Sequence, residues 1–208
     1  MDTSKVISRA RSTLLTPKTE WPIIAAEPET VGHLYSDYIL IMAAIPALVR
    51  FVSATLIGIR VPFIGTYRFS IATGLENALL TYVAALLGVY VVAMIVDALA
   101  PTFSGEKNRV QAFKTVAYTY TASWVASILG VIPGLGWIAA LLGLAYGIYL
   151  LRLALPVTMK CPDSNAVGYT VATIVVAIVV AVLLSVLVNA VLGTGARLEI
   201  APGAPYPR

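Results

Sequence analysis

The stretch VGYTVATIVVAIVVAVLLSVLVNAVL, Val167–Leu192, decides the class of fold. It is dominated by Val, Ile, Ala and Leu, and it contains no charged residue. A helix needs about 20 mainly apolar residues to cross the hydrocarbon core of a bilayer. The stretch therefore predicts a membrane-spanning helix.

Four further apolar segments precede this one, and each is predicted to span the membrane. They cover residues 38–59, 77–99, 112–132 and 135–155, and only Pro133-Gly134 separates the last two, which predicts a tight antiparallel hairpin. The whole chain is 59% hydrophobic and only 12% charged, about half the charged share of a soluble protein. The sequence therefore predicts an all-α, polytopic integral membrane protein with a bundle of five transmembrane helices.

Residues 1–35 form a separate N-terminal segment with a weak amphipathic pattern. Val6, Ala10 and Leu14 recur at four-residue steps, which predicts a short helix lying on an anionic membrane surface. A solvated, half-ordered tail is the alternative. Trp21 begins a second short helix and is predicted to be an interfacial anchor.

The distribution of Lys and Arg predicts the orientation. In a five-span arrangement, nine of the fourteen Lys and Arg residues fall on the side of the N-terminus, four fall on the other side, and Arg50 lies within a span. Because loops rich in Lys and Arg stay in the cytoplasm, the N-terminus is predicted to be cytoplasmic. The C-terminal residues 193–208, with three prolines, are predicted to be a disordered extracytoplasmic tail.

Arg50 and Asp97 are the intramembrane residues that could carry a function. Arg50 falls near the middle of the first span, where a charge is costly and must face the bundle, a cavity or an acidic partner, or else extend toward the interface. Asp97 lies in the last turn of the second span, where the helix dipole disfavours a carboxylate. Lys114 and Arg152 are predicted at the same depth, so a structural salt bridge or a cation site is expected around Asp97.

The third span is the most polar and aromatic. Tyr118 and Tyr120 could line a polar cavity from different helix faces, or pack between helices with hydrogen-bonded hydroxyl groups. In the fourth span, small residues recur at three- and four-residue steps and predict close helix packing. They are Gly136, Ala140, Gly143 and Gly147.

Several classes of function lack support in the sequence. Cys161 is the only cysteine and His33 the only histidine, so no metal site built from these residues is expected, and no cofactor is predicted. No arrangement of nucleophile, base and oxyanion hole is visible. The basic residues lie between the spans, which favours membrane orientation over nucleic-acid binding.

The order and spacing of several segments resemble the Ypt-interacting-protein (Yip) domain family in its bacterial form. The segments are PKTEW (17–21) with IAAEP (24–28), the 35–38 approach to the first span, DALAPTF (97–103), YTYTASW (118–124), and LPVTMK (155–160) followed by AVGYT (166–170). The resemblance covers residues 8–192 and implies five spans with a cytoplasmic N-terminus in a bacterial inner (plasma) membrane. Eukaryotic members bind small Rab-type GTPases. Arg50 departs from the family pattern, in which small or apolar residues are usual.

Three functions remain open from the sequence. The first is a non-enzymatic membrane organiser or adaptor that binds proteins or anionic lipid at its cytoplasmic face. The second is a channel or transporter for small solutes or ions, working as a homo-oligomer and using Arg50 and Asp97. The third, an enzyme acting on lipid, has no catalytic constellation behind it.

Overall fold

The computed structural model describes residues 3–61 and 65–193; most of the predicted tail, from residue 194 on, lies outside them. Its elements, in chain order, are α1 (Thr3–Leu15), α2 (Pro17–Ala26), α3 (Val31–Leu34), η1 (Tyr35–Ile39), α4 (Leu40–Phe51), η2 (Val52–Ile57), β1 (Ile59–Val61), β2 (Gly65–Tyr67), α5 (Ile71–Leu99), η3 (Ala100–Phe103), α6 (Arg109–Ala126), η4 (Ser127–Val131), α7 (Gly136–Thr158) and α8 (Asp163–Gly193).

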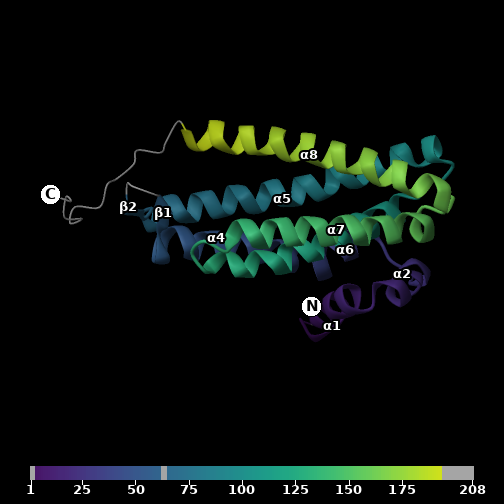
Figure 1. The fold of residues 1–208 in the computed structure, drawn as a ribbon, viewed down its shortest axis with the longest axis horizontal. Coiled ribbons are helices and arrows are strands. Elements are labelled where there is room, and N and C mark those ends of the chain that lie inside the picture. Colours follow the sequence, from purple (N-terminus) through teal and green to yellow (C-terminus); the bar gives the residue numbers. More distant parts are fainter. Residues whose placement is uncertain (1–2, 62–64, 194–208) are drawn as a thin grey trace.

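Helices α4 to α8 form a bundle along the long axis of the molecule (Figure 1). Helices α1 and α2 lie beside one end of it, where α5 ends and α8 begins. We call this the α2 end. The strands β1 and β2 mark the opposite end, which we call the β end; they form the short antiparallel connection between α4 and α5, with Ile59 opposite Tyr67.

Four helical segments are long and apolar enough to cross a membrane. They are Val31–Ile57, Ile71–Phe103, Gly136–Thr158 and Asp163–Val191. The first passes through Pro46 without ending there, and π-helical turns flank α4 on both sides. These segments confirm an all-helical membrane protein and correspond to four of the five predicted spans.

The predicted third span corresponds to α6, which is less hydrophobic than these four segments. This difference fits its position inside the bundle. Eleven of its 18 residues are buried, and it packs against α4, α5 and above all α7. A helix surrounded by other helices does not present its surface to lipid, so it can carry polar groups that contact protein. By contrast, the outermost helix, α8, keeps most of its apolar side chains exposed, among them Val171, Val182 and Leu187.

The exposed apolar surface of α5 indicates which part of the bundle faces lipid. Its exposed large apolar side chains all fall between Ile71 and Val91. Twenty residues of helix rise by about 30 Å, which matches the hydrocarbon core of a bilayer. The remaining turns of α5, up to Leu99, lie beyond this band toward the α2 end.

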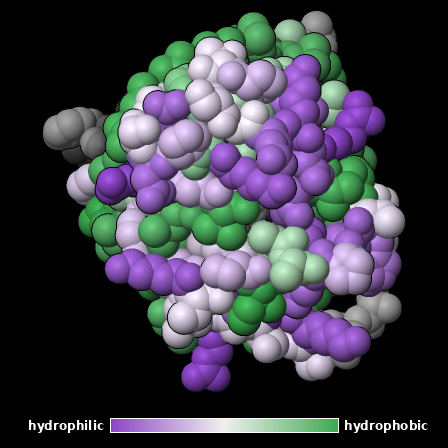
Figure 2. Space-filling view, turned by 90° about the vertical axis from the view of Figure 1, so that its right-hand side faces the viewer, coloured by the Kyte–Doolittle hydropathy of each residue, from purple (hydrophilic) through white to green (hydrophobic). Residues whose placement is uncertain are grey.

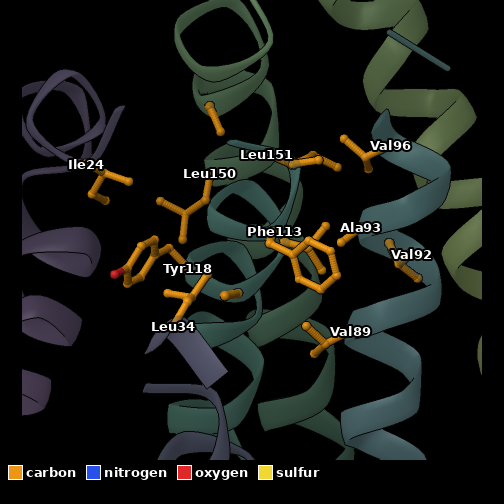
Figure 3. Packing of buried hydrophobic residues seen from close by; sticks show 14 of the residues in the cluster. Ile24, Leu34, Val89, Val92, Ala93, Val96, Phe113, Tyr118, Leu150 and Leu151 are labelled. Carbon is orange, nitrogen blue, oxygen red and sulfur yellow. The ribbon is translucent and has the colours of Figure 1, made fainter. Parts of the chain in front are cut away.

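The N-terminal segment is part of the core rather than a separate surface helix. Val6 and Ala10 of α1 are buried toward the bundle, and so are Trp21 and Ile24 of α2, each only 1% exposed. Figure 3 shows Ile24 facing Leu150 and Tyr118 across the interface. The prediction of Trp21 as an interfacial anchor is therefore wrong, because its ring packs inside the protein and does not reach a membrane interface.

Small residues bring α6 and α7 together, as the predicted stripe required. A Cβ atom on Gly143 would lie 2.9 Å from the Cα atom of Ser123 and 3.0 Å from the Cβ atom of Ala126. The observed stripe differs from the predicted one at one position, because Ala139 is buried and the predicted Ala140 is exposed. At the turn between α6 and α7, Gly134 has a positive φ of 87°, a conformation that glycine adopts without strain.

Candidate functional site

Arg9 of α1 is the centre of a charge cluster that joins the N-terminal helices. Its guanidinium group donates to the carboxylate of Glu20 and, at 2.6 Å, to Oε2 of Glu27, both brought close because α1 and α2 fold back on each other at Thr16. The same group lies 5.9 Å from the ring centroid of Tyr118, within cation–π range. Partial burial alone would lower the pKa of Arg9, but the hydrogen bond and charge of Glu27, with Glu20, raise it.

Lys114 of α6 holds the end of α2. Its ammonium group donates to the carbonyl oxygens of Ile24, at 2.7 Å, and Glu27, at 2.6 Å. These carbonyls belong to the last turn and the C-cap of α2, where helix geometry leaves them unpaired and the dipole favours a cation. Lys114 is only 2% exposed, so it is a structural cation that fixes α2 on the bundle.

The expected salt bridge among Asp97, Lys114 and Arg152 is therefore wrong. Lys114 binds α2 instead, and Arg152 is exposed on α7. Asp97 is half-buried, and its Oδ1 atom has no hydrogen-bond partner among the residues that the structure describes. Nearby, Tyr169 of α8 donates its hydroxyl proton to the carbonyl oxygen of Val96, and this contact ties α8 to the end of α5.

Tyr118 and Tyr120 face different parts of the molecule, as their spacing predicts. Tyr118 packs edge-on against Trp21, with ring centroids 6.5 Å apart, and against Tyr38, at 4.7 Å. The hydroxyl group of Tyr38 makes a 2.6 Å hydrogen bond with that of Thr121. Tyr118 thus belongs to the interface with the N-terminal helices, whereas Tyr120 faces cavities on the α8 side.

A polar cleft opens between the N-terminal helices and the start of the first span. Its cavity volume is about 610 Å³, and its charged residues are Lys5, Arg9, Glu20, Glu27, Glu29, His33 and Asp37. His33 bridges two carboxylates, with Nδ1 2.7 Å from Glu29 and Nε2 2.8 Å from Asp37. We call this the charged cleft; Figure 2 shows the hydrophilic side chains gathered over the α2 end of the molecule.

Sequence reasoning missed most of the charged cleft. It included Arg9 only in the count of basic residues on the side of the N-terminus, and it gave no role to the carboxylates of Glu20 and Glu27. The signal was present in part: Glu20 and Glu27 are seven residues apart, a spacing that places them on one side of a helical segment. What the pattern did not contain was the fold-back of α1 onto α2, which brings Arg9 between them.

Arg50 lies in a second cavity, between α4, α5, α6 and α8, with a volume of about 480 Å³. Polar groups of Thr81, Ser123, Ser185 and Asn189 share this cavity with it. Arg50 makes no hydrogen bond and no ion pair with any other residue in the described part of the chain. Within residues 3–61 and 65–193 no cluster of three His, Cys, Asp or Glu side chains is arranged to hold a metal ion.

The comparisons with known proteins agree with this architecture. The Yip1 domain family pattern matches residues 11–184, which include α2, the bundle helices and most of α8. The chain belongs to the Yip1 domain family. Residue 50 and both residues of the His33–Asp37 pair lie inside the matched range.

The inner membrane protein YohC of Escherichia coli strain K12 is 29% identical to this chain over 185 residues, covering 88% of this chain and 94% of YohC. YohC of Escherichia coli O6:H1 matches with the same identity and coverage. No solved structure matches this Yip1 domain chain. The similarity to an inner membrane protein over 88% of this chain supports the membrane assignment that the apolar helices give.

Proposed function

We propose that this Yip1 domain protein is a non-enzymatic membrane organiser or adaptor that recruits a protein partner to its charged cleft. Its five-span topology would place the N-terminus in the cytoplasm, the C-terminus outside, and the α2 end at the cytoplasmic surface. Three observations support that topology: the four long apolar helices, the similarity of the chain to an inner membrane protein, and the excess of Lys and Arg on one side. The buried helix α6 supplies the fifth span.

The observation that carries the proposal is the preformed charged cleft at the α2 end. Its walls are held by buried contacts of Trp21, Lys114 and Tyr118, so the cleft does not need a partner in order to form. A preorganised site loses little conformational entropy on binding. The cleft lies beside the bundle on the side of α1 and α2, toward the α2 end.

The charge of the cleft favours a basic protein segment. Four carboxylates line it, on Glu20, Glu27, Glu29 and Asp37, against the two cations of Lys5 and Arg9 and the one imidazole of His33. His33 is 63% exposed, so a partner cation can reach the carboxylates that it bridges. Such complementarity steers association and fixes the orientation of a partner. Anionic headgroups would instead contact exposed cations outside the cleft, such as Arg152 and Lys107.

A photo-crosslinking amino acid in place of Ile23 tests this proposal in intact membranes. Ile23 is half exposed and lines the cleft, so its replacement should crosslink to a protein partner. The double variant Glu29→Gln/Asp37→Asn should abolish that crosslink, whereas Glu76→Gln, an exposed carboxylate on the part of α5 toward the β end, should leave it unchanged. Crosslinks to lipid alone, or crosslinks that survive the double variant, would contradict recruitment through the cleft. A crosslink to a second copy of the chain would make the partner a homo-oligomer.

Transport is the second candidate, and the cavity around Arg50 is the observation in its favour. A pathway that used both Arg50 and Asp97 would have to pass the packed residues Val89, Val92 and Val96 of α5. Flux assays in liposomes with Arg50→Ala and Asp97→Asn distinguish the two functions. Recruitment predicts no protein-dependent flux of ions or small solutes, and a flux that either substitution alters would favour transport.

A further inference from the structure

The cavity around Arg50 continues into an apolar cavity that no step of recruitment uses. The two cavities share Tyr120, Ser123, Ala177 and Ala181 as lining residues, and both lie beside α8. The second cavity has a volume of about 210 Å³ and is lined almost entirely by carbon, including Val92, Val116, Leu151 and Ile174. Together they form a groove, polar at the Arg50 end and apolar at the other, which we call the α8 groove.

Arg50 lies within the hydrocarbon thickness. The α5 residues that line its cavity, Thr81 to Val89, fall within the exposed apolar band between Ile71 and Val91. The ring of Phe51, next to Arg50, lies against Gly74, so Arg50 is near the β-end edge of that band. A guanidinium group stays protonated there and retains donors that must find acceptors. No carboxylate lines either cavity, so the described part of the protein offers Arg50 no anion. Arg50 is exposed at the cavity, so an anion from outside the chain can reach it and supply the missing negative charge.

The dimensions and polarity of the α8 groove fit a lipid. From Thr81, which lines the Arg50 cavity, to Val92, which lines the apolar cavity, α5 rises by about 16 Å. This is about half the thickness of the hydrocarbon core, and so about the length of an acyl chain in one leaflet. The guanidinium group can donate two parallel hydrogen bonds to a phosphate. The hydroxyl and amide groups of Ser123, Ser185 and Asn189 offer additional polar contacts.

We propose that the α8 groove binds one anionic phospholipid, with the phosphate on Arg50 and an acyl chain in the apolar cavity. The lipid belongs to the leaflet at the β end, so that its headgroup lies toward that end and its chain runs toward the α2 end. Occupancy supplies the missing counter-ion of Arg50 and fills the space beside α8. The groove lies away from the charged cleft, so this binding does not depend on the recruitment proposed above.

Native mass spectrometry of the purified protein titrated with phosphatidylglycerol or phosphatidylcholine tests the proposal. The wild type should bind one phosphatidylglycerol tightly, and at least about tenfold more tightly than phosphatidylcholine. Both lipids carry the phosphate, but the choline cation of phosphatidylcholine cancels the net negative charge that Arg50 would neutralise. Arg50→Gln should remove that preference, and Arg50→Lys should restore part of it. Arg152→Gln, which removes an exposed cation on α7, is the matched control and should keep it.

A second variant tests the chain cavity without touching the charge. Ala177→Phe places a ring where the two cavities meet and should weaken phosphatidylglycerol binding about tenfold while the protein stays folded. Oleate distinguishes a phospholipid from a simple fatty carboxylate. The proposal is overturned if Arg50→Gln keeps the full preference, if Arg152→Gln loses as much as Arg50→Gln does, if Ala177→Phe binds as the wild type does, or if oleate occupies the groove and phosphatidylglycerol does not.

Discussion

The interface of the N-terminal helices and the α8 groove both contain an arginine, and the two are treated in opposite ways. Arg9 lines the charged cleft, where it contacts the carboxylates of Glu20 and Glu27 and the ring of Tyr118. Arg50 contacts no counter-ion in the described residues and borders an open cavity. The N-terminal interface therefore pairs its arginine within the chain, whereas the α8 groove leaves its arginine without a partner among the described residues.

This difference indicates which region stabilises the fold and which region can bind a component of the membrane. A charge whose partners come from the chain itself contributes to stability, and removing it leaves buried groups unpaired. A charge without partners in the chain contributes little to stability on its own. A ligand that pairs with it in the folded state then stabilises that state. The N-terminal interface should therefore govern unfolding, and the α8 groove should govern lipid binding.

The largest expected effect comes from a comparison of the tryptophans Trp21 and Trp137. Trp21→Ala should destabilise the protein by about 3–5 kcal/mol, because it empties a buried site between α2 and Tyr118. Trp137→Ala, at a side chain 66% exposed on α7, should cost less than about 1 kcal/mol. Chemical unfolding in detergent followed by circular dichroism measures both. Equal losses in the two variants would mean that the N-terminal helices do not belong to the core.

Removal of Lys114 should release α2 from the bundle. Lys114→Met keeps the length of the side chain but leaves the carbonyls of Ile24 and Glu27 unpaired, at a cost of about 2–3 kcal/mol. Hydrogen exchange of residues 17–27 should accelerate more than exchange in α5. The control is Lys107→Met, at an exposed lysine near the start of α6. It should change neither the stability nor the hydrogen exchange of residues 17–27. Unchanged protection of α2 in Lys114→Met would contradict this role.

Two glycines contrast close packing with open space. Gly143→Ala should destabilise the protein by about 1–3 kcal/mol, because its new methyl group would meet the Ser123 backbone at 2.9 Å between α7 and α6. Gly88→Ala borders the α8 groove and meets only the flexible end of Leu184, at 3.4 Å, so it should be tolerated or slightly stabilising. Thermal unfolding of the two variants compares them directly. A larger loss for Gly88→Ala would mean that α8 packs more tightly than α7.

The smallest effect concerns the thiol at the α2 end. Burial raises the pKa of Cys161, with a further contribution from the charge of Asp163. Because only the thiolate reacts, maleimide labelling of Cys161 at pH 7.5 should be at least about tenfold slower than that of an exposed cysteine. The double variant Cys161→Ser/Ser164→Cys gives that comparison, since Ser164 is exposed.

Because the pKa of the folded state lies above that of the unfolded state, ionisation of Cys161 opposes folding. The resulting loss of stability should begin only as the pH rises past the ordinary thiol value of about 8.5. If the wild type is labelled at Cys161 as fast as the double variant is labelled at its introduced thiol, this end of the bundle is open.

The sequence predicted the features that depend on local pattern. The predicted spans 77–99 and 167–192 lie within the helices Ile71–Leu99 and Asp163–Gly193, because a bilayer requires long apolar runs that are visible in the sequence. The Pro133-Gly134 turn follows from the conformations of those two residues. The different faces of Tyr118 and Tyr120 follow from helical geometry alone. Arg50 was recognised as a candidate because a charge at mid-depth is rare.

The features that the sequence did not predict depend on tertiary contacts between distant segments. Lys114 was expected beside Asp97, but it reaches about 90 residues back along the chain to the end of α2, a distance that no periodicity encodes. Trp21 was assigned to a lipid interface because aromatic residues are common there, yet the ring of Tyr118 and the end of α2 enclose it. The sequence did not pair Arg9 with a carboxylate, because only the fold-back of α1 and α2 brings Glu20 and Glu27 to it.

The most direct test compares Arg9→Gln and Arg50→Gln in thermal unfolding, with and without phosphatidylglycerol. Arg9→Gln should lower the stability by about 1–3 kcal/mol in both conditions and keep the full stabilisation by the lipid. Arg50→Gln should unfold like the wild type without lipid and should lose the stabilisation that phosphatidylglycerol provides. The opposite pattern, in which Arg50 controls intrinsic stability and Arg9 controls the response to lipid, would contradict the division between the two regions.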